Sequence, residues 1–109
     1  MPKTSFSGFA WDDSNREKCQ KHGVPISEIE YVLAHTETLV MPDLKNTQAE
    51  ARFLAIGRTE KGRYTFVVFT PRQSGRATLL RPISTRYMHR REIRKYEQEI
   101  ARVQKRPRG

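Results

Sequence analysis

The sequence contains one cysteine, Cys19, and no apolar segment long enough to span a bilayer. A single cysteine excludes an internal disulfide framework and a metal site built from several cysteines. The N-terminal stretch MPKTSFSGFAWDD lacks the apolar core of a signal peptide. We therefore expect a cytoplasmic protein that does not bind membranes.

Several catalytic and cofactor motifs are also missing. The chain has neither a P-loop motif nor a GxGxxG segment, so a nucleotide-phosphate cradle is not expected. Acidic residues lie mainly at predicted helix starts, which does not indicate a paired-carboxylate hydrolase. The histidines are scattered and form no HExxH motif, so the sequence predicts no metal and no cofactor. They are His22, His35 and His89.

Positive charge is abundant and unevenly distributed. Residues 1–50 contain five Lys or Arg against eight Asp or Glu, whereas residues 51–109 contain sixteen against four. A chain of 109 residues forms one domain, 1–109, with one modest core. The charge asymmetry indicates a polyanion or an acidic partner for the C-terminal half. The alternative is a solubility charge, together with a flexible basic tail at 104–109.

Hydrophobic periodicity and turn signals predict the order β, α, α, β, β, β, β, α. Ser14 with Glu17, and Ser27 with Glu30, have capping-box spacing for the first two helices. Ile26 and Tyr31 are placed as a hydrophobic staple for the second helix, and Gly23 as the stop of the first. Strands are expected at 6–11, 37–43, 52–58, 63–70 and 77–84, and helices within 11–23, within 24–35 and from about residue 85.

Consecutive strands with short turns predict an α+β fold: a mostly antiparallel meander covered on one face by helices, two N-terminal and one C-terminal. The segment YTFVVF is apolar on both faces, which favours a central position in the sheet, and Pro82 favours an edge or a bulge. In the last helix, a histidine followed by four apolar or aromatic residues recurs every three or four positions, which predicts a stripe docked on the core. These are His89, Ile93, Tyr96, Ile100 and Val103.

Arginine, lysine and histidine are the remaining chemical groups in quantity. Cations bind nucleic-acid phosphates, and they can also catalyse RNA cleavage in which a 2′-OH attacks the neighbouring phosphate. The planar fork of arginine suits the dianionic transition state, and histidine can transfer protons. Most surface cations are simply solvated, as expected for those off the helical stripe. These are Arg90, Arg91, Arg94, Lys95 and Arg102.

Six segments in order and spacing resemble the BrnT toxins of bacterial type II toxin–antitoxin systems. They are FAWDD, KHGV, SEIEYVL, EARFLAIGR, VVFTPR and RPISTRYMHRREIRKYE, which together run from about Phe9 to Tyr96. The resemblance implies a RelE-like fold and RNA cleavage that blocks translation. It also implies a BrnA-like antitoxin with a ribbon-helix-helix domain, and operator DNA bound only through the toxin–antitoxin complex. The chain departs from the family pattern at Pro82 and Thr85.

The resemblance carries roles to single positions. Lys21, His22 and Gly23 match the family's KHG segment, and Glu50 and Arg52 match its E-x-R segment. Arg72 matches the arginine that closes the VVYT-x-R strand, and Ser84 and Arg86 match the segment entering the last helix. We expect Arg86, Arg72, Lys21, His22 and Glu50 to be catalytic, and Arg52, Arg81, Arg90 and Arg94 to bind RNA.

Each of these residues has a structural alternative. Arg86 is the first candidate for the phosphate site, or else an arginine in a structural salt bridge, for instance with Glu50. Arg72 is the second candidate, as a phosphate clamp, or else an arginine exposed at a turn. Glu50 could orient an arginine or act as a base. Lys21 and His22 are also favoured at a helix C-terminus by the helix dipole alone. Two other functions stay open: a non-catalytic nucleic-acid-binding module, and an interaction domain whose basic surface receives an acidic partner.

Overall fold

The computed structural model describes residues 6–43 and 51–104. Glu50 and residues 105–109 of the predicted basic tail lie outside this range, while Gln104 is the last residue of a helix. The described elements follow the expected order. They are β1 (Gly8–Phe9), α1 (Asp13–Gln20), α2 (Ile26–Ala34), β2 (Leu39–Pro42), β3 (Phe53–Arg58), β4 (Tyr64–Ser74), β5 (Ala77–Tyr87) and α3 (Arg90–Gln104).

The strands form one sheet in the order β1-β5-β4-β3-β2, with β4 in the centre as predicted. Strands β2 to β5 pair antiparallel, which confirms the mostly antiparallel α+β prediction. The prediction of a meander alone is wrong at β1, because β1 pairs in parallel with β5 and makes the sheet mixed. Its neighbours Ser7 and Ala10 donate backbone hydrogen bonds to Thr78 and Leu80, at 2.8 and 2.9 Å. This short strand covers an edge of β5 that would otherwise expose unpaired backbone groups.

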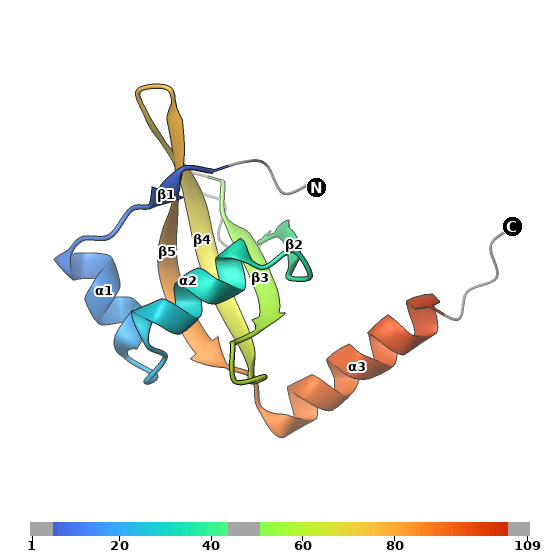
Figure 1. Cartoon of the computed structure of the whole chain (residues 1–109). Helices are drawn as coiled ribbons and strands as arrows, with labels where there is room; N and C mark the ends of the chain where they lie inside the picture. The colour runs from blue at the N-terminus through green and yellow to red at the C-terminus, as the bar shows by residue number, and fades with distance from the viewer. Residues whose placement is uncertain (1–5, 44–50, 105–109) are drawn as a thin grey trace, which may run out of the picture.

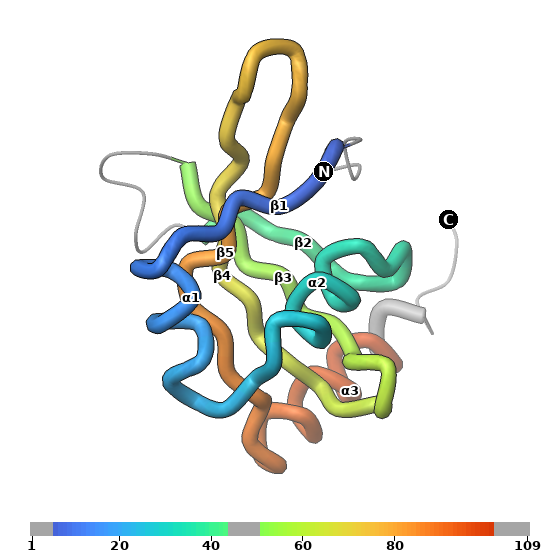
Figure 2. The backbone as a smooth tube through the Cα atoms, turned by 60° about the vertical axis from the view of Figure 1, so that its left-hand side comes forward, coloured from blue at the N-terminus to red at the C-terminus, as the bar shows by residue number. Residues whose placement is uncertain are grey.

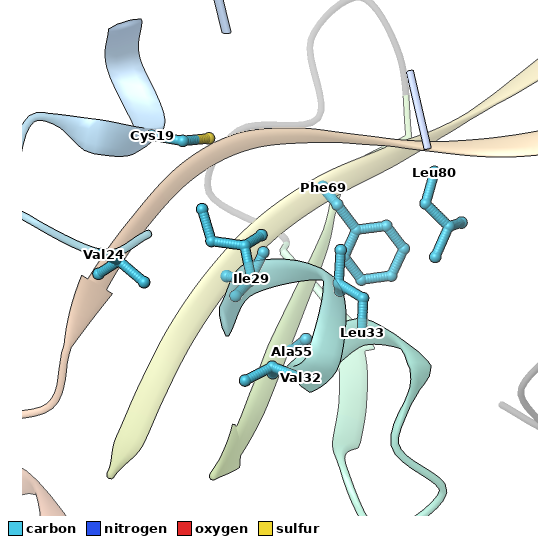
Figure 3. Packing of buried hydrophobic residues seen from close by; sticks show 9 residues of the cluster. Cys19, Val24, Ile29, Val32, Leu33, Ala55, Phe69 and Leu80 are labelled. Carbon is cyan, nitrogen blue, oxygen red and sulfur yellow. The ribbon is translucent and has the colours of Figure 1, made fainter. Parts of the chain in front are cut away.

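Helices α1 and α2 cover one face of the sheet (Figure 1). The core lies between α2 and the central strands, where Ile29 and Val32 are fully buried and meet the strand residues Ala55, Val67 and Phe69. Figure 3 shows the α2 side chains pointing toward the sheet. Because side chains alternate across a strand, the neighbours of these strand residues lie on the opposite face.

The helix starts differ from the predicted capping boxes. Asp12 caps α1, and its side chain and that of Asn15 exchange hydrogen bonds with each other's backbone N–H at 3.0 and 2.7 Å. Pro25, which has no side-chain cap bond, precedes α2, and the Glu30 carboxylate accepts a bond from Trp11 instead. Helix α1 ends at Gln20, three residues before the predicted stop, and Gly23 lies in the following turn with φ = 79°, a conformation that favours glycine.

Strands β4 and β5 are longer than predicted and form a hairpin that projects beyond the helices (Figure 2). The pairing register shifts between Val68, which faces Ser84, and Phe69, which faces Pro82. Residue 83 is therefore the extra residue of a bulge next to Pro82, which agrees with the prediction of an edge or a bulge at this proline. The C-terminal end of β5 extends to Tyr87, so Arg86 lies within a strand and not at the start of a helix.

Helix α3 begins at Arg90, five residues later than predicted, and extends away from the sheet (Figure 1). Its stripe is not docked on the core: Ile93, Tyr96 and Ile100 are only half-buried. Tyr96 packs edge-on against Tyr64, with ring centroids 5.6 Å apart. Tyr64 points to the sheet face opposite α1 and α2, so the prediction that all helices cover one face is wrong for α3. In the described residues, no helix is both long and apolar enough to cross a membrane.

Candidate functional site

A cavity of about 300 Å³ lies on the sheet face that α1 and α2 leave uncovered. Leu54, Phe66 and Val68 form its apolar part, since they alternate with core residues along β3 and β4. The other lining residues are polar: His22, Asp43, Ser84, Thr85 and Arg86. The cavity therefore combines a nonpolar floor with an arginine, a histidine and one carboxylate.

The guanidinium of Arg86 is held from several sides. Its Nη1 and Nη2 atoms donate to Glu92 Oε1 and Oε2, each at 2.8 Å, and Nη1 also donates to the Tyr87 carbonyl at 3.3 Å. The Cζ atom lies 4.6 Å from the centroid of the Phe66 ring. Burial of the pair is partial, with 38% of the Arg86 and 33% of the Glu92 side chain exposed. A cation held in this way has little freedom to rotate.

The carboxylate of Glu92 belongs to the first turn of α3. Its Oε1 accepts a hydrogen bond from the His89 backbone N–H at 2.8 Å, and the Ile93 N–H donates to the His89 carbonyl at 2.9 Å. This is one half of a capping box, with His89 in the cap position. The bonds from Arg86, and then that from His89, lower the pKa of Glu92 to about 2, while the same carboxylate raises the pKa of Arg86. Both groups are therefore charged at neutral pH.

His22 and Lys21 lie in the turn that follows α1. His22 lines the cavity, so the structure brings it to the same site as Arg86. Lys21 is the exposed C-cap residue of α1. Thr85 also borders the cavity, but its hydroxyl points to the helix-covered face of the sheet, where it donates to the Cys19 carbonyl at 2.6 Å and so ties α1 to β5. This bond fixes the turn carrying His22 relative to the strand carrying Arg86.

Arg72 lies far from this cavity. Arg86 faces Phe66 across the β4–β5 pair, and Arg72 is six residues further along β4. At about 3.3 Å per residue, this places the two arginines roughly 20 Å apart. Arg72 is exposed and lies near the end of β4, the strand that forms the projecting hairpin with β5 (Figure 2).

The remaining predicted site residues are dispersed. Arg81 forms an ion pair with Asp12 at 2.8 Å and so supports the start of α1. Arg52 is half-buried before β3, and its carbonyl accepts from the Asp43 N–H at 2.8 Å. Arg90 and Arg94 are exposed on the first turns of α3, whereas Glu50 is outside the described residues.

Sequence reasoning missed Glu92 and Phe66, the two side chains that hold the Arg86 guanidinium. Glu92 follows His89 by three positions, which is the spacing of a capping box, and that signal could have marked it. The contact of Phe66 with Arg86 depends on the pairing register of β4 and β5, which cannot be predicted from the sequence. Across residues 6–43 and 51–104, no three His, Cys, Asp or Glu side chains gather in a group that could hold a metal ion.

A larger groove of about 870 Å³ lies between α3, the end of α2 and the edge of β3. Its lining is rich in tyrosine and carries one arginine, Arg58, and none of the predicted site residues. The smaller cavity also has one arginine, but it has a single carboxylate, Asp43, where the groove has Glu37 and Glu97, so its charge is the more favourable for an anion. The lining residues are Tyr31, His35, Glu37, Thr38, Ile56, Gly57, Arg58, Thr59, Gly62, Tyr64, Tyr96, Glu97, Ile100 and Ala101.

Comparison with protein families gives a match to the family described as the ribonuclease toxin, BrnT, of type II toxin–antitoxin systems. The match covers residues 11–92, which include every residue of the cavity as well as Glu92. No curated protein matches the chain. A match over most of the chain establishes the family, and the family in turn implies an RNA substrate and an antitoxin partner. The chain therefore belongs to the BrnT family of ribonuclease toxins.

Proposed function

We propose that this protein is a metal-independent endoribonuclease with a RelE-like fold, and that the cavity beside Arg86 holds the scissile phosphate. The observation that carries the proposal is an arginine fixed by two hydrogen bonds to Glu92 in a cavity that also contains His22. A volume of about 300 Å³ is comparable with one nucleotide, and the apolar floor offers a surface for an unstacked base.

The donors of Arg86 indicate how a phosphate would bind. A guanidinium has five N–H groups; two on Nη1 and one on Nη2 are used by Glu92 and the Tyr87 carbonyl. The Nε–H and the second N–H of Nη2 lie side by side on the remaining edge. That edge matches two oxygens of one phosphate.

The cleavage step follows from these groups. The 2′-OH attacks the adjacent phosphorus and loses its proton, the P–O5′ bond breaks, and the 5′-oxygen takes up a proton. The products are a 2′,3′-cyclic phosphate and a free 5′-OH. Arg86 stabilises the dianionic transition state, and His22 protonates the leaving oxygen. Lys21 adds positive charge beside the cavity, and Glu50 is the candidate base.

The other cations guide the rest of the RNA. Arg90 and Arg94 are exposed on the first turns of α3, next to the helix start that carries Glu92. Arg72 and Arg52 lie along other parts of the sheet and would contact neighbouring phosphates. Binding through these residues weakens as salt rises, because it releases counterions from RNA.

In the cell, we propose that RNA cleavage inhibits translation and arrests growth. A BrnA-like antitoxin with a ribbon-helix-helix domain neutralises the toxin, and operator DNA is bound only through the complex of the two proteins. Membership of a type II toxin–antitoxin family supports this arrangement.

The experiment tests cleavage and its chemistry together. Purified protein is incubated with RNA in EDTA, and the product ends are analysed, with an Arg91→Ala variant as a control for an exposed cation outside the cavity. We expect EDTA-resistant cleavage with cyclic phosphate ends, by wild type and by the control alike. Intact RNA at micromolar protein would refute the ribonuclease proposal. Binding of RNA without cleavage would favour the nucleic-acid-binding module. If the protein neither binds nor cleaves RNA, the interaction domain is favoured.

A further inference from the structure

Glu92 connects the candidate phosphate site to the start of α3. Its two oxygens receive three hydrogen bonds, two from Arg86 and one from the His89 backbone N–H, all at 2.8 Å. The bond to the helix backbone fixes where the carboxylate lies. The carboxylate in turn fixes where the guanidinium lies.

The bond pattern leaves one orientation for the Arg86 plane. Glu92 takes the end of the guanidinium formed by Nη1 and Nη2, the Tyr87 carbonyl takes a further Nη1 hydrogen, and Phe66 lies against the face. Without Glu92, the long side chain would regain rotational freedom about its outer bonds. The phosphate-binding edge of Nε and Nη2 would then point in several directions.

We propose that Glu92 is a positioning residue for RNA cleavage, which aligns the Nε and Nη2 edge of Arg86 with the scissile phosphate. This inference rests on the proposed ribonuclease function. Glu92 itself contacts no reacting atom, because both of its oxygens are occupied by Arg86 and the start of α3. Its effect on the reaction passes through Arg86.

Glu92 could position Arg86, block the site, or only cap α3, and its negative charge helps to distinguish these roles. A carboxylate next to a phosphate site repels RNA, so removing its charge leaves ground-state binding unchanged or stronger. If Glu92 only blocked the site, its removal would speed cleavage. If it only capped α3, its removal would lower stability and leave the rate of the folded protein unchanged. Loss of positioning lowers kcat without raising KM, because the aligned contact forms fully only in the transition state.

Glu92→Gln is the sharpest variant. The glutamine keeps an oxygen that can accept from the His89 N–H, so the helix start is preserved, but it has one acceptor where Arg86 needs two. Glu92→Asp is the second variant, because it keeps the negative charge but shortens the side chain by one methylene. Glu97→Gln is the matched control: the same change five residues later on α3, where the carboxylate accepts from the Tyr64 hydroxyl at 3.4 Å.

The assay measures kcat and KM on a fluorescent RNA, with a thermal melt of each variant. We expect both Glu92 variants to lose about 10- to 100-fold in kcat, the range expected when a reacting geometry shifts by about 1 Å. We expect KM to stay equal or to fall, and Glu97→Gln to cleave as wild type does. In an Arg86→Lys background there is no guanidinium to align, so the Glu92→Gln change should lower kcat by less than threefold.

Each other result overturns the inference. A kcat within twofold of wild type in folded Glu92→Gln and Glu92→Asp refutes positioning and leaves the ribonuclease proposal standing. Faster cleavage by Glu92→Gln shows that the carboxylate blocks the site. A loss of equal size in the Arg86→Lys background shows that Glu92 does not act through Arg86. Intact RNA with wild-type protein refutes the proposed function, and the inference falls with it.

Discussion

Replacing Arg86 by alanine tests whether its cation acts on RNA or only stabilises the fold. The structural loss can be estimated from its contacts. The ion pair with Glu92 is about one third exposed on each side, which limits its contribution to about 1 kcal/mol. The contact of the guanidinium with the Phe66 ring adds about 0.5–1 kcal/mol.

The sum, up to about 2 kcal/mol, is smaller than the stability of an ordinary domain. Since about 1 kcal/mol lowers Tm by roughly 4–8 °C in a chain of this size, Arg86→Ala remains folded at 25 °C. The catalytic loss is larger, because a fixed cation aimed at developing charge contributes about 3 kcal/mol, or about 10²-fold in rate. Activity should therefore fall far more than the folded fraction.

The assay combines RNA cleavage at 25 °C with a denaturant melt of the same samples. Arg63→Ala is the matched control, because Arg63 also lies over an aromatic ring, that of Tyr87, at 3.6 Å, but on the face covered by the helices. We expect the control to lose some stability and no activity. Arg86→Lys keeps the charge without the fork, so its rate should lie between those of wild type and Arg86→Ala.

Two results would refute this reasoning. Cleavage by Arg86→Ala within threefold of wild type would remove Arg86 from the site. An unfolded Arg86→Ala at 25 °C would show that its contacts matter far more for stability than about 2 kcal/mol, so that the lost activity says nothing about catalysis.

Three further predictions concern other contacts. Asn15 is only 2% exposed, and its side chain accepts from the Asp12 N–H and donates to the Ala10 and Pro82 carbonyls. Asn15→Ala removes these three hydrogen bonds, so we expect a denaturant melt to show a loss of about 3 kcal/mol in the free energy of unfolding. A loss below about 1 kcal/mol would contradict this. Burial raises the pKa of the Cys19 thiol to about 11, so a thiol reagent should react at neutral pH only as the protein unfolds, and rapid reaction with folded protein would count against it. The bonds from Arg86 lower the pKa of Glu92 from 4.5 to about 2, so their stabilisation is complete above pH 4.5 and is lost as the pH falls through 2. The Tm difference between wild type and Glu92→Gln should therefore become smaller as the pH falls. A difference that stays constant would show that the Arg86–Glu92 ion pair does not stabilise the fold.

Local patterns were enough to predict most of the sheet. The sequences of β3 and β4 are rich in β-branched and aromatic residues and are bounded by turn signals. Both strands were predicted to start within a few residues of where they do. The parallel pairing of β1 with β5 could not be predicted in this way. It joins Gly8–Phe9 to Leu79–Leu80, which are far apart in sequence and carry no matching local signal.

The junction of β5 and α3 was misplaced for a similar reason. A helical stripe predicted helix from about Thr85, yet Thr85 and Tyr87 remain in the strand. The Thr85 hydroxyl bonds to the Cys19 carbonyl and the Tyr87 hydroxyl to Glu28, each at 2.6 Å. These bonds to α1 and α2 outweigh the helical periodicity, because propensity is a weak preference beside tertiary contacts. The shift places Arg86 on a strand, where its direction is set by the sheet.

The charge count predicted a polyanion or an acidic partner, but it could not say which cations act together. Register separates Arg72 from Arg86 by roughly 20 Å, so the two cannot bind one phosphate and would have to contact different phosphates of one RNA strand. Arg81 is neutralised by Asp12 and so adds little net charge at its position. Arg86 is also paired, but its partner occupies one edge of the guanidinium and leaves the other available. An ion pair therefore does not exclude a catalytic arginine. What matters is which donors the pair uses, and the sequence does not contain that information.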